Sequence, residues 1–158
     1  MRIKFLSLIA AVALVAACET APKDTGAATT DGAATAGTVR PGSQEDLVVN
    51  VGDRVFFGLD RYDLSPEARG TLDRQAQWLK TYPNVTVTVE GHADERGTRE
   101  YNLALGERRA NSVKNYLVAQ GIPSGRVKVV SYGKERPAVL GSGEAAWAQN
   151  RRGVTVVD

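Results

Sequence analysis

The chain has 158 residues, 20 of them basic and 18 acidic, with one histidine and one cysteine. Arg2 and Lys4 fall in an N-terminal segment that is predicted to be removed, and without them the chain is formally neutral. This balance argues against the broad basic face of a nucleic-acid-binding protein. The remaining length suits one small domain.

The N-terminus has the pattern of a secretory signal, with a positive start followed by an apolar run from Phe5 to Val15. A membrane-spanning helix needs about 20 apolar residues, so this run is too short to be one. Residues 1–17 are therefore predicted to be a signal peptide outside the folded protein. The run leads into Val-Ala-Ala-Cys at residues 15–18, which resembles the bacterial lipobox. An ordinary signal peptide that happens to end near a cysteine is the alternative.

Cys18 is the only cysteine, so no disulfide can form within the chain. By resemblance to bacterial lipoproteins, Cys18 is expected to carry a thioether-linked diacylglyceryl group and an amide-linked acyl chain. Several acyl chains are needed because a single one holds a protein to a membrane only marginally. Glu19 follows, instead of the aspartate associated with inner-membrane retention, and this favours the outer membrane.

Residues 18–46 are predicted to be the lipidated cysteine and a flexible tether. Their composition falls mainly to Ala, Thr, Gly, Asp and Pro, and Val39 is the only large apolar residue. Such a segment cannot bury enough apolar surface to offset the entropy of ordering it. A flexible chain of this length has a root-mean-square span of about 30 Å, so the tether would let a folded domain reach away from its membrane.

The predicted domain, residues 47–158, begins with a short strand at residues 55–57. Ser65 and Pro66 then supply a helix N-cap and a proline at the first helical position. Apolar residues at helical spacing predict one buried face for this helix: Ala68, Leu72, Ala76 and Leu79. Strict alternation in VTVTVEG, residues 85–91, predicts a half-buried strand that ends at Gly91.

A second helix is predicted from residue 99 to 120. Its expected core stripe is Leu103, Gly106, Ala110, Val113 and Leu117. A strand at residues 126–133, a short helix at 143–152 and a final strand at 153–157 follow. Alternating strands and helices predict an α/β fold in one layered domain, with at least one parallel pair of strands.

Opposite charges gather in the loop and helix at residues 91–110, GHADERGTREYNLALGERRA. A metal site there would have to use His92, Asp94 and Glu95, and a lone histidine without a cysteine makes this a weak candidate. Acid–base catalysis needs two carboxylates in different environments, whereas Asp94 and Glu95 are adjacent with Arg96 beside them. His92 is better explained as a loop-ordering or strand-end residue than as a base. The other charges of the segment are expected to lie on the solvated surface, as weak pairs.

Three residues of the second helix share a stripe beside the core stripe: Asn102, Leu105 and Arg109. This stripe can face the loop that contains Asp94, which leaves the carboxyl end of a strand, where α/β proteins commonly bind ligands. Because Asp94 and Arg109 lie off the predicted core stripe, the fold is expected to survive truncation of either.

The segment VEGHADERGTREYNLALGERRANSVKNYL closely resembles the central signature of the outer-membrane protein A C-terminal-like family. The likeness begins at FFGLDRYDL and continues through VSYGKERPAVLGSGEAAWAQNRR. With a lipobox and a low-complexity tether, the chain is most similar to the family's peptidoglycan-associated lipoproteins. The resemblance implies a mixed four-stranded sheet packed with helices.

In that family the domain binds peptidoglycan non-covalently, through the meso-diaminopimelate of the stem peptide. The resemblance implies that Asp94 pairs with the ammonium of diaminopimelate and that Arg109 grips its carboxylate. Guanidinium suits this task because it binds carboxylate as a planar fork, which lysine lacks. Further contacts are expected from Phe57, Gly58, Asn102 and Leu105, although other members carry aspartate where this chain has Gly58.

The implied role is that of a lipoprotein, not an enzyme, anchored in the outer membrane with its domain in the periplasm. It would link that membrane to the cell wall within the Tol–Pal system, which serves envelope integrity and cell division. No cofactor, metal or nucleic acid is expected. The alternative is a subunit that chiefly docks TolB or other Tol proteins, with wall binding secondary.

Overall fold

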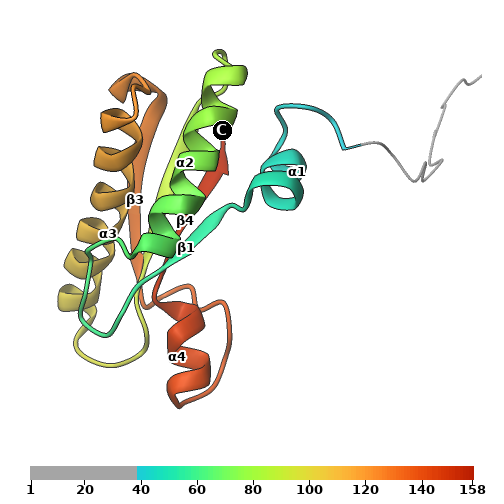
Figure 1. Cartoon of the computed structure of the whole chain (residues 1–158). Helices are drawn as coiled ribbons and strands as arrows, with labels where there is room; N and C mark the ends of the chain where they lie inside the picture. Colours follow the sequence, from blue (N-terminus) through green and yellow to red (C-terminus); the bar gives the residue numbers. More distant parts are fainter. Residues whose placement is uncertain (1–38) are drawn as a thin grey trace, which may run out of the picture. The chain divides into compact units, whose positions relative to one another are not determined.

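A computed structural model describes residues 39–158; the signal segment, Cys18 and most of the predicted tether lie outside these residues. The described chain forms ten elements of helix, turn and strand (Figure 1). They are α1 (Gln44–Asp46), the π-helical turn η1 (Leu47–Val51), β1 (Arg54–Phe56), α2 (Pro66–Thr81), β2 (Val87–His92), α3 (Arg99–Ala119), the 3-10 turn η2 (Ser124–Arg126), β3 (Val127–Gly133), α4 (Glu144–Asn150) and β4 (Arg152–Val157).

The strands form one four-stranded sheet in the order β1-β4-β2-β3. β2 and β3 are parallel, and α3 is the crossover between them. β4 runs antiparallel to both of its neighbours, so the sheet is mixed. This confirms the α/β fold and the predicted parallel pair. The last strand, β4, lies between β1 and β2. This placement depends on pairing between residues far apart in the sequence, which local patterns do not encode.

The first long helix follows its sequence signals closely. Ser65 caps α2 by accepting a hydrogen bond from the backbone N–H of Ala68, and Pro66 occupies the first turn. The four predicted core positions of α2 are all buried, and they join the valines of β2 in one apolar core. α2 and α3 lie side by side along the sheet (Figure 1), so both helices bury their apolar faces in this core.

The buried face of α3 is wider than its predicted stripe. Gly106, Ala110, Val113 and Leu117 are buried as expected, but Leu103 is only partly buried. The neighbouring stripe of Asn102, Leu105 and Arg109 is buried as well, at 2%, 5% and 0% exposure. The expectation that Arg109 lies outside the core is therefore wrong. The segment after β1 lies over this flank of the helix, where the carbonyls of Gly58 and Arg61 accept hydrogen bonds from the Arg109 guanidinium.

The packed chain also begins before the expected boundary at Leu47. Ser43 caps α1, and the Asp46 carboxylate accepts a 2.9 Å hydrogen bond from Nε1 of Trp78 in α2. Gln44 accepts a 2.7 Å bond from the backbone N–H of Val157. These contacts attach residues 43–46 to α2 and β4, so the end of the predicted tether belongs to the domain.

None of the helices in residues 39–158 has the length and apolar character needed to cross a bilayer.

Candidate functional site

A cavity of about 210 Å³ opens where the segment after β1, the loop after β2 and the first turns of α3 meet. The loop after β2 thus lies at the carboxyl end of a strand, as the sequence predicted. The residues lining the cavity are Leu59, Asp60, Asp94, Arg96, Gly97, Tyr101, Asn102, Leu105 and Arg109.

Four of the six predicted ligand contacts line this one cavity: Asp94, Asn102, Leu105 and Arg109. Phe57 and Gly58 do not, because Leu59 and Asp60 supply the wall from that segment. Phe57 is a core residue, 5% exposed, whose ring centroid lies 5.3 Å from Cζ of Arg109. Phe57 and Gly58 therefore support Arg109 without reaching the cavity.

Arg109 is held almost entirely by backbone. Its Nε donates to Arg61 O at 2.8 Å, Nη1 to His92 O at 2.8 Å and Nη2 to Gly58 O at 3.1 Å. A guanidinium has five N–H donors, so two of them, on the terminal nitrogens, remain for another acceptor. Burial, and next the charge of Arg151, lower the pKa of Arg109 to about 10, which leaves it positively charged at neutral pH. Its side chain borders the cavity although no part of it is exposed to solvent.

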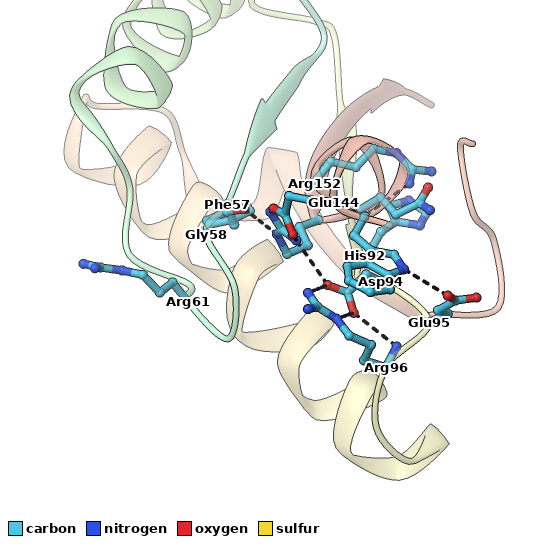
Figure 2. A network of polar contacts seen from close by, with 12 residues as sticks. Phe57, Gly58, Arg61, His92, Asp94, Glu95, Arg96, Glu144 and Arg152 are labelled. Atoms are coloured by element: carbon cyan, nitrogen blue, oxygen red, sulfur yellow. Dashed lines mark hydrogen bonds and ion pairs between the residues drawn. The ribbon is translucent and has the colours of Figure 1, made fainter. Parts of the chain in front are cut away.

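Asp94 pairs with two arginines, neither of which is Arg109. Arg96 binds it in a fork, with Nε 3.1 Å from Oδ1 and Nη2 2.6 Å from Oδ2. Nη1 of Arg151 lies 3.3 Å from the same Oδ2. Figure 2 shows the Asp94 carboxylate facing the Arg96 guanidinium. Burial alone would raise the pKa of Asp94, but these hydrogen bonds outweigh it and hold the pKa below its ordinary 3.8. The carboxylate therefore stays ionised at neutral pH.

The sequence did not single out Arg151, nor four of the residues that line the cavity: Leu59, Asp60, Gly97 and Tyr101. Arg151 is 5% exposed, and its Nε donates to Phe57 O at 3.0 Å while its terminal nitrogens bond Glu144 and Asp94. It thereby links β1, the loop after β2 and α4. The only sequence signal is the pair of arginines that ends the family-like segment, and nothing local marks Arg151 as buried.

α4 braces the loop that carries Asp94. Nε1 of Trp147 donates to Glu95 at 2.9 Å, and Cζ of Arg96 lies 4.0 Å from the centre of the Trp147 ring. Asn102 holds the same loop from the other side by donating to Arg96 O at 2.8 Å. Arg96 thus differs from the solvated surface charge expected there, because its side chain is only 34% exposed and forms a fork with Asp94.

His92 ends β2, as predicted, and is 1% exposed. Neither ring nitrogen has a hydrogen-bond partner in the described part of the chain, although Oε2 of Glu90 lies 3.5 Å from Nε2. Burial, and next the charge of Arg152, lower the pKa of His92 to about 4, so the ring is neutral at neutral pH. Within residues 39–158 no three His, Cys, Asp or Glu side chains converge as metal ligands would.

Known proteins match most of the described chain. The model of the OmpA family matches residues 56–151. A peptidoglycan-associated lipoprotein of Rhizobium meliloti is 57% identical over 77% of this chain and 69% of its own length. One from Mesorhizobium japonicum is 50% identical over 95% of this chain and 90% of its own length.

Among solved structures, the peptidoglycan-associated lipoprotein of Burkholderia pseudomallei superposes with a TM-score of 0.66 at 42% identity, covering 67% of this chain and 90% of that one. These relatives are named for association with peptidoglycan and not for an enzymatic reaction. The chain therefore belongs to the OmpA family and, within it, to the peptidoglycan-associated lipoproteins.

Proposed function

We propose that the cavity binds the diaminopimelate side chain of a peptidoglycan stem peptide. The free end of this side chain carries an ammonium and a carboxylate on one carbon, so a complementary site needs one acid and one base. The observation that carries the proposal is that a buried carboxylate, Asp94, and a buried guanidinium, Arg109, border the same cavity.

Arg109 is suited to receive the ligand carboxylate. Its position is fixed by three backbone carbonyls, and its two remaining N–H donors lie on the terminal nitrogens that bind carboxylates as a fork. A preorganised donor loses little conformational entropy when the ligand binds. Lysine at this position would keep a charge but would lose both the fork and the carbonyl contacts.

Asp94 would receive the ammonium, and the apolar side chains of Leu59 and Leu105 would contact the methylene groups between the two ends of diaminopimelate. Each contact matches one chemical part of the ligand. A lysine-type stem peptide offers the ammonium without the carboxylate, so it would leave Arg109 without a ligand partner.

We also propose the cellular role that this binding would serve. A lipid anchor on Cys18 would hold the protein in the outer membrane, and the tether would place the domain in the periplasm, within reach of the wall. The protein would thus link membrane and wall as part of the Tol–Pal system, with TolB and other Tol proteins as partners. The lipobox at residues 15–18 and the relatives' names support the lipid anchor and the association with peptidoglycan.

Sedimentation with purified sacculi tests the proposed ligand. Asp94→Asn and Arg109→Lys should each weaken binding about 10- to 150-fold, because a charge-assisted hydrogen bond contributes about 1.5–3 kcal/mol. Arg108→Ala is the matched control, because Arg108 is exposed and does not line the cavity. Equal binding of lysine-type and diaminopimelate-type sacculi would contradict the proposal, as would an equal loss in Arg108→Ala.

A further inference from the structure

We propose that Arg96 is an internal competitor that occupies the ammonium position on Asp94 and must move away before a cationic ligand can bind. This inference rests on the proposed function, since it concerns how the same cavity receives its ligand. It makes Arg96 a residue that sets affinity and selectivity rather than a fixed part of the wall.

Donors within the protein already fill the acceptor positions of Asp94. An ionised carboxylate offers about four acceptor positions. Oδ1 accepts from the backbone N and from Nε of Arg96, each at 3.1 Å, and Oδ2 accepts from Nη2 of Arg96 at 2.6 Å and Nη1 of Arg151 at 3.3 Å. Asp94 is also only 5% exposed. A ligand ammonium therefore cannot simply be added to Asp94; it has to replace a donor that is already there.

Of the two arginines bound to Asp94, Arg96 is the easier one to displace. The Arg151 side chain is 6% exposed and is also tied to Phe57 O and Glu144. The Arg96 side chain is 34% exposed, and its guanidinium hydrogen-bonds only Asp94 among the described residues. Arg96 also lines the cavity, whereas Arg151 does not. Displacing the Arg96 fork breaks bonds to Asp94 alone and frees one acceptor position on each oxygen, while the Arg96 backbone N–H and Arg151 stay bound.

Groups that already surround the Arg96 guanidinium would continue to stabilise it after it leaves Asp94. The guanidinium lies over the ring of Trp147, and the carboxylates of Glu95 and Glu144 both favour its positive charge. Figure 2 shows these two acids on either side of the Asp94–Arg96 pair. The backbone of Arg96 would stay in place, held by Asn102, so only the side chain has to move.

Such a competitor has a consequence for selectivity. A ligand that brings no cation gains nothing from displacing Arg96, because Asp94 would then lose a partner inside the protein. A ligand with an ammonium exchanges one ion pair for another, and its net gain must come from its further contacts. The Arg96–Asp94 pair therefore lowers the affinity for every cationic ligand, whereas a neutral ligand leaves the pair in place and its affinity does not depend on it.

The test uses the mature lipoprotein in detergent and stem peptides that differ only in the third residue, which is diaminopimelate, lysine or norleucine. Arg96→Gln removes the competing charge, and Arg99→Gln, an exposed arginine outside the cavity, is the control for net charge. By calorimetry, Arg96→Gln should bind the diaminopimelate and lysine peptides about 2- to 5-fold more tightly, the range of a partly exposed ion pair. The norleucine peptide should show no gain, and Arg99→Gln should match the wild type. In an Asp94→Asn background the gain should disappear.

Unchanged or weaker binding of the diaminopimelate peptide by Arg96→Gln would overturn the inference, because Arg96 would then be neutral or a direct contact. An equal gain for norleucine would also overturn it, since the effect would come from added room and not from charge. A wild-type protein that does not prefer diaminopimelate to norleucine would instead contradict the proposed function itself.

Discussion

Gly91 of β2 and Gly106 of α3 meet backbone against backbone. A Cβ atom on Gly91 would lie 1.8 Å from the carbonyl oxygen of Gly106, closer than any two such atoms can come. This contact sets how closely α3 crosses the sheet. Asp94 lies three residues after Gly91, and Arg109 lies three residues after Gly106. The contact between the glycines therefore brings the two charged residues of the cavity into one region.

Gly91→Ala should therefore destabilise the domain strongly. The atom in the way is backbone, so α3 would have to move off the sheet, at a cost of about 1–3 kcal/mol or more. Gly70→Ala is the opposite case: a Cβ there meets nothing within 4 Å in α2, and alanine should stabilise the helix by about 0.5–1 kcal/mol. Urea unfolding of both variants checks this; similar stability for the two would contradict it.

Arg109→Ala should lower the free energy of unfolding as well as ligand binding. Of the three carbonyls that would lose the guanidinium, only His92 O is in a fully buried bond, and Gly58 O keeps a bond from the Arg61 N–H. A buried carbonyl left unsatisfied costs about 1–3 kcal/mol. The neighbouring Arg108→Ala should stay near the wild type, because the Arg108 side chain is exposed, with its Cζ 5.6 Å from the centre of the Tyr62 ring. Thermal unfolding measures the difference. A wild-type melting temperature for Arg109→Ala would show that the carbonyls find other donors.

Arg151→Gln should destabilise the domain by about 3 kcal/mol or more, because it removes one partner from a buried ion pair. The loss should also weaken sacculus binding, since Arg151 links the loop of Asp94 to β1 and α4. Arg54→Gln is a suitable comparison, because Arg54 is half-exposed and pairs only with its neighbour Asp53. Equal stabilities for the two variants, measured by chemical unfolding, would argue against a structural role for Arg151.

His92 should make the protein less stable as the pH falls from about 6.5 to about 4. The folded pKa is near 4 and the unfolded value near 6.5, so in this window only the unfolded state binds the proton. The contribution is at most about 3 kcal/mol and becomes constant below both values. His92→Gln should flatten this part of the stability–pH curve, whatever its effect at pH 7. An unchanged slope would mean that another group titrates there.

Cys18→Ser should abolish lipidation and leave the protein soluble in the periplasm or as an uncleaved precursor. The reason is chemical, since serine cannot form the thioether to the diacylglyceryl group. Mass spectrometry of the mature N-terminus, together with membrane fractionation, provides the measurement. An unmodified Cys18 in a chain that is cleaved elsewhere would show that residues 15–18 do not act as a lipobox.

The local parts of this protein were determined by the sequence itself. The cap at Ser65, the helical spacing of α2 and the alternation in β2 each depend on residues within a few positions of one another, and the structure confirms all three. The family-like signature placed Asp94, Asn102, Leu105 and Arg109 together because family motifs record positions that the fold brings close.

Only the tertiary structure decided which charges pair and which are buried. Arg109 looked like a residue beside the core because its burial depends on carbonyls from the segment after β1, far away in the sequence. Asp94 finds Arg151 only because β4 is inserted between β1 and β2, which brings the end of the chain to the middle of the sheet. Periodicity reports which face of one element is apolar; the ion pairs here form between distant elements, whose relative placement is fixed by packing of the whole domain.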